Sequence, residues 1–188
     1  GRRQTDESRY EIGRDMAMTP GKVIARSEIC EIIQYAPTTE TVFKRPLLII
    51  PPWINKFYIL DLTPQKSFVR WCVEQGHTVF MVSWVNPDER HAEMGWESYV
   101  NDGIDFALKT VNAATGERDI NAIGYCVGGT LLATALARQS DKPNSRQPRI
   151  ASAPFLSAQV DFTHPGDLQL FFDEDPLPTL RTPITAVG

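Results

Sequence analysis

The stretch NAIGYCVGGTLLATALA, residues 121–137, places Cys126 between glycines, where a β-favouring run gives way to a helical pattern. Gly124 stands two residues before the cysteine and Gly128 two residues after it. So abrupt a turn from strand to helix forces the middle residue into a strained conformation and needs neighbours without side chains. The helix amino terminus supplies unpaired N–H groups and partial positive charge, which favour a thiolate and can hold an oxyanion. The pattern therefore indicates a nucleophile that attacks an acyl group.

The alternative is that Cys126 is a small buried side chain, which is the usual role of a free cysteine. On position alone the two interpretations are equal. Cys30 and Cys72 lie on apolar faces of their elements, and we expect both to be structural. Three widely spaced cysteines suit neither a disulfide framework nor a C-x-x-C metal site, so we expect reduced thiols and no metal.

The elements that must position Cys126 are visible as alternating patterns. Apolar runs predict buried strands at residues 45–53, 77–84, 119–126 and 149–160. Helical spacing predicts helices at residues 63–76, 94–116 and 128–139. Two β-rich runs before them predict an antiparallel edge pair at residues 23–25 and 29–35.

Strands that alternate with helices predict an α/β fold with a mostly parallel sheet and helices on both faces. Ligands of such sheets bind beyond the carboxyl ends of the strands, and Cys126 ends the predicted strand 119–126 at that edge. We expect a polar amino-terminal segment at residues 1–20 and one catalytic domain at residues 21–188.

Composition narrows the classes of partner. The chain has 188 residues, of which 42% are hydrophobic, and a net charge of −4, without a basic run dense enough to follow phosphates. We therefore expect no nucleic acid partner. No apolar stretch reaches the roughly 20 residues that cross a bilayer, and the first residues are polar. We expect a cytoplasmic protein without a transmembrane segment.

Several longer blocks carry a family resemblance. The letters GYCVGG fit the nucleophile motif G-x-S-x-G with cysteine in place of serine. The block LIIPPWINKFYILDLTPQKSFVRWCVEQGHTVFMVSWVNPD spans residues 48–88, with IIQYAP before it and DFTHPGDLQLFFDE after the last predicted strand. With these residues the chain resembles the polyhydroxyalkanoate synthases, specifically the class I type that uses short monomers without a second subunit.

The resemblance implies an α/β-hydrolase fold that polymerises (R)-3-hydroxyacyl groups from coenzyme A thioesters and releases CoA. Cys126 would be the nucleophile, and no cofactor is implied beyond this substrate. The first oxyanion donor would be the backbone N–H of Val127, and the second that of Ile54 in the loop PPWIN. Trp53 and Asn55 on that loop would shape the substrate entrance. The family also implies a homodimer in the cytoplasm at the surface of polyester granules.

The chain departs from the family at its acid and base. The family completes the nucleophile with an Asp and then a His late in the chain. Here His77 and His91 precede the cysteine, and His164 sits where the family does not carry its base. The letters LPTLRTPITAVG, residues 177–188, resemble a late strand of α/β-hydrolases, whose carboxyl end carries the acid. We expect that the cap and last strands are missing or shortened, and that Cys126 can be acylated once without sustained polymerisation.

Two other functions remain open. A thioesterase or esterase could use the same motif, with water as the acyl acceptor; the cysteine and the block around PPWINKFYILDL favour transfer over hydrolysis. A noncatalytic fragment could bind granules or an intact synthase through the retained fold, and the missing Asp and His favour this alternative.

Four further residues receive structural interpretations. Trp71 and Trp96 have the spacing of helical core positions, which indicates packing. Asp88 is expected to cap a loop, and Asp102 to be an exposed charge on a helix.

Overall fold

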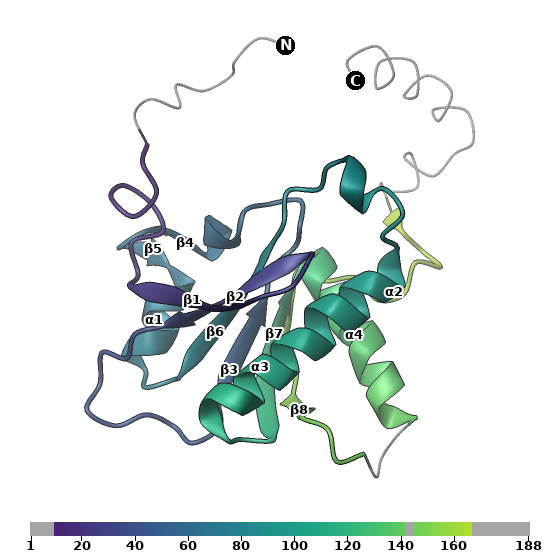
Figure 1. The fold of residues 1–188 in the computed structure, drawn as a ribbon. Helices are drawn as coiled ribbons and strands as arrows, with labels where there is room; N and C mark the ends of the chain where they lie inside the picture. The colour runs from purple at the N-terminus through teal and green to yellow at the C-terminus, as the bar shows by residue number, and fades with distance from the viewer. Residues whose placement is uncertain (1–9, 142–144, 167–188) are drawn as a thin grey trace. The chain divides into compact units, whose positions relative to one another are not determined.

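A mixed β-sheet with helices on both faces forms the frame of the first of two units (Figure 1). The computed structural model describes residues 10–141 and 145–166. The first unit runs to Ala158 and holds this sheet; the second begins at Gln159. The seven strands, in their order across the sheet, are β1 (Gly21–Arg26), β2 (Cys30–Tyr35), β6 (Val79–Trp84), β3 (Leu47–Ile50), β7 (Asp119–Tyr125) and β8 (Arg149–Ser152), with β9 (Phe155–Leu156) also paired to β7.

The strand directions match the sequence prediction. Strands β6, β3, β7 and β8 are parallel to one another, and β9 is parallel to β7. Strands β1 and β2 form the predicted antiparallel pair, and β2 also runs antiparallel to β6. The carboxyl ends of β3, β6 and β7 therefore meet at one edge of the sheet.

Helices cover both faces of the central strands, as predicted. Leu48 and Ile50 of β3 pack with α3 (Phe106–Thr115) and α4 (Val127–Ser140). Leu47 and Ile49 point to the other face, where they pack with α1 (Phe68–Glu74). Every residue of β3 is buried, which explains its uninterrupted apolar run.

The first predicted helix is shorter than expected. The prediction of a helix from residue 63 is wrong, because Pro64 lies in the turn of a small hairpin, β4 (Asp61–Thr63) and β5 (Lys66–Ser67). Helix α1 begins only at Phe68, after Ser67, whose hydroxyl accepts a hydrogen bond from the Arg70 N–H at 2.9 Å.

The second predicted helix is interrupted by a different winding. It begins with α2 (Trp96–Ser98), continues as a π-helix (Tyr99–Asp105), and becomes regular in α3. Gly116 ends it in the left-handed region with φ 74°, as expected for a glycine that closes a helix. The π-helical turns bring Gly103 against the ring of Trp84.

The predicted strand 149–160 is two short strands rather than one. Strand β8 ends at Ser152, and β9 begins at Phe155 after Pro154. Pro154 has no N–H to give to a ladder, but its carbonyl accepts from the Gly124 N–H at 3.1 Å. The chain therefore pairs with β7 twice, first through β8 and again through β9.

Two of the four structural interpretations need comment. Trp71 does not pack into the core: its side chain is 54% exposed and stacks on Phe68 with ring centroids 5.9 Å apart. Trp96 is 42% exposed, although its ring contacts Trp53. Asp88 caps a 3-10 helix and Asp102 is exposed, as predicted. Among the described residues, no helix combines the length and apolar character that crossing a membrane requires.

The buried carboxylate of Asp61 attaches residues 17–19 to the sheet region. It accepts hydrogen bonds from the hydroxyls of Thr19 and Ser67 at 2.7 and 2.6 Å, and from the Thr19 N–H at 3.2 Å. The Asp61 carbonyl accepts a further bond from the Ala17 N–H at 2.8 Å. The end of the predicted polar segment 1–20 is therefore held in place.

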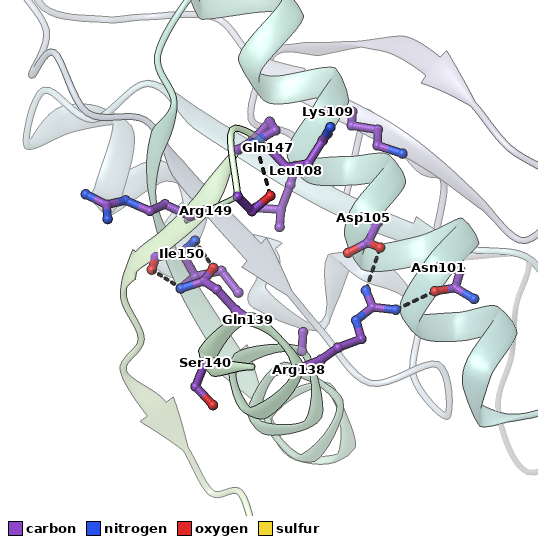
Figure 2. Close-up of a pocket in the computed structure, with 13 residues that line it drawn as sticks. Asn101, Asp105, Leu108, Lys109, Arg138, Gln139, Ser140, Gln147, Arg149 and Ile150 are labelled. Atoms are coloured by element: carbon purple, nitrogen blue, oxygen red, sulfur yellow. Dashed lines mark hydrogen bonds and ion pairs between the residues drawn. The ribbon is translucent and has the colours of Figure 1, made fainter. Parts of the chain in front are cut away.

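The side chain of Gln139 pairs with the backbone of β8. Its amide N–H donates to the Ile150 carbonyl at 3.0 Å, and its carbonyl accepts from the Ile150 N–H at 2.8 Å (Figure 2). Ile150 is buried, so both of its backbone polar groups are satisfied by a side chain of α4.

Replacing Gln139 with methionine should lower the free energy of unfolding by about 1–3 kcal/mol, because two buried backbone groups lose their partners. The Ile150 amide should also exchange with solvent faster. Urea unfolding and amide hydrogen exchange measure both effects. Gln75→Met, at an exposed position, is the control and should change stability by less than about 0.5 kcal/mol. Equal stability of the Gln139 and Gln75 variants would show that the hydrogen bonds between Gln139 and the Ile150 backbone do not stabilise the fold.

Candidate functional site

Cys126 lies at the bend between β7 and α4. Its backbone has φ 52° and ψ −127°, a conformation that costs a non-glycine residue about 1–3 kcal/mol. The Cys126 N–H donates to the Leu156 carbonyl of β9 at 2.9 Å, and α4 begins at the next residue. The side chain is half-buried. The abrupt strand-to-helix turn predicted from the glycine spacing is present.

The glycines around Cys126 allow three elements to pass at contact distance. A Cβ on Gly128 would lie 2.2 Å from the Ile50 carbonyl oxygen and 2.7 Å from that of Pro51. A Cβ on Gly124 would lie 2.4 Å from the Cα of Gly129. Because real Cβ atoms do not approach backbone this closely, any side chain here would separate α4 from β3 or from β7.

The first turn of α4 offers donors beside the cysteine. The Cys126 carbonyl accepts from the Gly129 N–H at 2.8 Å and the Thr130 N–H at 3.3 Å. Val127 is the first helical residue, so its N–H has no acceptor within the helix. Its position next to Cys126 is consistent with the predicted oxyanion donor.

The loop after β3 runs past this same turn. Pro51 and Pro52 are buried, Trp53 is partly buried, and the Ile54 side chain is 73% exposed. The contact of Pro51 with Gly128 brings the loop next to α4. Asn55 is exposed, and the neighbouring Lys56 ammonium donates to the Asn86 side chain in the loop after β6. The donor role of Ile54 and the entrance role of Asn55 stay predictions.

Trp53 is the centre of an aromatic cluster that sequence reasoning missed. Its ring centroid lies 4.6 Å from that of Tyr99, 5.7 Å from Trp96 and 5.9 Å from Trp84. The members come from three segments, the loop after β3, the end of β6, and α2 with the π-helix. The available signal was that each segment meets the carboxyl edge of the sheet.

The two histidines before Cys126 are engaged elsewhere. His77 precedes β6 at its amino end, and its ring lies 5.0 Å from that of Phe43. His91 is buried and completes a capping box: its Nδ1 lies 2.9 Å from the Asp88 carboxylate and 3.1 Å from the Asp88 backbone nitrogen. The Arg90 guanidinium holds the pKa of Asp88 well below its usual range.

His164 belongs to the second unit, which the structure describes only at residues 159–166. Within that segment Asp161 accepts hydrogen bonds from the N–H and hydroxyl of Thr163 at 2.9 and 2.6 Å. The predicted late strand at residues 177–188 lies outside the described residues.

Two cavities open away from Cys126. One, of about 540 Å³, lies between α3, α4 and the start of β8 (Figure 2). Its lining includes Leu108, Ala135 and Ile150, together with Arg138 and Asp105, which pair at 2.5 Å. The other, of about 500 Å³, is lined by charged residues where β7 and β8 begin. Ala135 stands eight residues after the start of α4, about 12 Å along the helix at 1.5 Å per residue. Cys126 lines neither cavity.

Comparison with known proteins shows which sequences this chain resembles. Residues 1–72 match the family described as the N-terminus of poly-beta-hydroxybutyrate polymerase. A poly(3-hydroxyalkanoate) polymerase subunit of Rhizobium etli is 61% identical over 186 residues, 99% of this chain and 29% of the relative. The corresponding subunit of Cupriavidus necator is 46% identical over 171 residues, 91% of this chain and 28% of the relative. The chain is a relative of the poly(3-hydroxyalkanoate) polymerases.

The matched part is limited, since the chain spans less than a third of the length of these polymerases. Solved structures agree on the fold. A sugar hydrolase from Lactococcus lactis superposes with a TM-score of 0.52 at 13% identity, covering 76% of this chain and 55% of that chain. An HSL homologue from a metagenome library has a TM-score of 0.52 at 14% identity, covering 80% and 47%. The predicted α/β-hydrolase-like fold of this polymerase relative is confirmed.

The three cysteines of the polymerase relative have different surroundings. Cys30 and Cys72 are buried in the two cores, as predicted, and burial raises the pKa of each thiol to about 11. Cys126 is half-buried at the sheet edge. The structural and the candidate reactive thiols are therefore distinguishable by chemistry.

Iodoacetamide at about pH 8 should modify Cys126 and spare Cys30 and Cys72, whose buried thiols stay protonated at that pH. Peptide mapping by mass spectrometry identifies the modified residue. In concentrated urea all three should react, which serves as the control. If Cys30 in the folded chain is modified as fast as Cys126, burial does not protect the Cys30 thiol from alkylation.

Gly128→Ala should lower the free energy of unfolding by about 1–3 kcal/mol or more, because the new methyl group meets backbone atoms of β3. Gly95→Ala is the matched control: nothing lies within 4 Å of its Cβ position, and its φ of −93° suits any residue. Urea unfolding of both variants makes the comparison. A Gly128 variant as stable as the Gly95 variant would refute the close approach of α4 to β3.

Proposed function

We propose that this chain carries the nucleophile of a polyhydroxyalkanoate polymerase, and that Cys126 accepts an (R)-3-hydroxyacyl group from a CoA thioester. The observation that carries the proposal is the bend at Cys126, which sets a half-buried thiol at the carboxyl edge of a parallel sheet and at the first turn of α4. The relatives, which are named poly(3-hydroxyalkanoate) polymerases, supply the substrate class.

The acylation step needs only groups at this bend. The Cys126 thiolate attacks the thioester carbonyl, and the carbonyl oxygen becomes an oxyanion that the Val127 N–H and a donor of the loop after β3 can hold. The intermediate collapses, the bond to the CoA sulfur breaks, and CoA leaves as a thiolate that takes a proton from water. The acyl group remains on Cys126 as a thioester, which is more reactive toward an incoming hydroxyl than a serine ester.

Chain extension needs a further group. The hydroxyl of the next monomer must lose its proton as it attacks the acyl-cysteine, which calls for a general base. His77 and His91 are packed or hydrogen-bonded away from the bend, and His164 sits where the family does not carry its base. We therefore propose that this chain is acylated once and does not by itself polymerise. The noncatalytic alternative, binding to granules or to an intact synthase, is favoured by the same observation.

The proposal extends to the setting in which the family works. We infer a homodimer of the class I type in the cytoplasm, associated with the surface of polyester granules. Apolar side chains are exposed in the amino-terminal part of the chain, among them Tyr10, Ile12 and Val23. They offer contacts for a second copy or for the polymer surface.

Incubation with (R)-3-hydroxybutyryl-CoA should release at most about one CoA per chain and leave one acyl group on Cys126. Intact mass and thiol release measure both. Cys126→Ala should abolish the adduct, whereas Cys72→Ala, at a buried thiol away from the bend, should retain it. Repeated CoA release with free hydroxy acid would favour the thioesterase alternative. A folded chain that forms no adduct would contradict the proposal.

A further inference from the structure

We propose that Trp84 is a positioning residue for the oxyanion loop, the name used here for residues 51–55. Its indole N–H fixes the Pro51 carbonyl and, through it, the backbone N–H groups that follow beside Cys126. The inference rests on the proposed function, because the position of this loop affects chemistry only if an acyl group is transferred to Cys126.

A single hydrogen bond joins the ends of two neighbouring strands. Trp84 is the last residue of β6, which pairs in parallel with β3, and its Nε1–H donates to the Pro51 carbonyl at 2.7 Å. Pro51 and Pro52 have no N–H, so the chain leaving β3 cannot continue the ladder by donating to a neighbour. The indole instead donates to the carbonyl of Pro51, which ties the start of the loop to the end of β6.

The Pro51 peptide is held from a second direction by α4. A Cβ on Gly128 would lie 2.7 Å from the Pro51 oxygen and 2.8 Å from its carbonyl carbon, so the helix backbone is in direct contact with this peptide. Gly128 follows Cys126 by two residues. The oxyanion loop is therefore clamped between the indole of Trp84 and the turn that carries the thiol.

The indole itself is fixed in place by its neighbours. A Cβ on Gly103 would lie 2.6 Å from the Trp84 ring, so the glycine in the π-helix makes room for it. The ring centroid lies 5.3 Å from Tyr99 and 5.9 Å from Trp53, the latter edge-on at 86°. These contacts leave the donor little freedom to turn away from Pro51.

This clamp acts on the first donors available after the two prolines. Those donors are the N–H groups of Trp53 and Ile54, and an oxyanion donor works only within about 2.7–3.1 Å of the developing charge. Loss of the indole N–H removes the hydrogen bond that fixes the Pro51 carbonyl. Acylation should slow for that reason, since small misplacements of catalytic groups cost large factors in rate.

Two reactions of the same thiol separate positioning from general damage. Transfer from a thioester passes through an oxyanion, whereas iodoacetamide reacts by direct displacement, in which the S–C bond forms as the C–I bond breaks and iodide leaves. We therefore compare the single-turnover rate of acylation by (R)-3-hydroxybutyryl-CoA with the rate of alkylation by iodoacetamide. Trp84→Phe keeps an aromatic ring and removes the N–H. Trp71→Phe is the control, because Trp71 is exposed on α1, which covers the other face of the sheet.

Trp84→Phe should lower the maximal acylation rate about tenfold to a hundredfold, with a similar half-saturating substrate concentration and alkylation changed less than about twofold. Trp71→Phe should leave both rates near those of the unsubstituted chain. If Trp84→Phe does not fold, the benzothiophene isostere at position 84, which keeps the shape and lacks the N–H, makes the same test.

The outcomes distinguish this inference from the function on which it rests. An unsubstituted chain that is alkylated but never acylated contradicts the proposed function, and the inference with it. An acylated chain whose Trp84 variant keeps both rates of the unsubstituted chain overturns the positioning role alone. A fall in both rates by the same factor in that variant also overturns it, because the loss then lies in the thiol or in the fold.

Discussion

The backbone of Cys126 is held at a positive φ, and the arrangement of the surrounding elements depends on that bend. The conformation costs about 1–3 kcal/mol, which the packing around it must exceed. Gly128 against β3 and Gly124 against Gly129 allow that packing, since a Cβ at either position would lie closer than atoms can approach. The same contacts direct β7 into α4 within one residue and leave the thiol at the edge of the sheet.

A second set of contacts approaches the bend from the side of β3 and β6. The two prolines end the hydrogen-bonded ladder of β3. Aromatic rings from the end of β6, from α2 and from the π-helix pack against Trp53 in the loop that follows. Backbone contacts through glycine and side-chain contacts through tryptophan thus converge on the Pro51 peptide. The glycine contacts and the tryptophan contacts together fix where the loop after β3 lies relative to the turn that carries Cys126.

The sequence predicts what depends on local pattern. Alternation of apolar runs yields the parallel strands, and the glycine spacing predicts the bend at Cys126. Prediction from the sequence fails where one local pattern has two interpretations, or where a contact joins segments far apart in the chain. Pro64 suits a helix start and a turn equally, and the helical spacing of Trp71 does not determine which face of a seven-residue helix is buried. The hydrogen bond between Trp84 and Pro51 joins residues 33 positions apart. The local pattern around either residue does not indicate the other as its partner.

The most direct measurement of the central claim is a crystal structure of the chain alkylated at Cys126 with iodoacetamide. The account predicts that Cys126 keeps its positive φ, that Gly128 stays in contact with the Ile50 and Pro51 carbonyls, and that the amide oxygen of the adduct approaches the Val127 N–H. A Cys126 in ordinary helical or extended backbone, with its sulfur turned among the aliphatic side chains of β7 and α4, would contradict it.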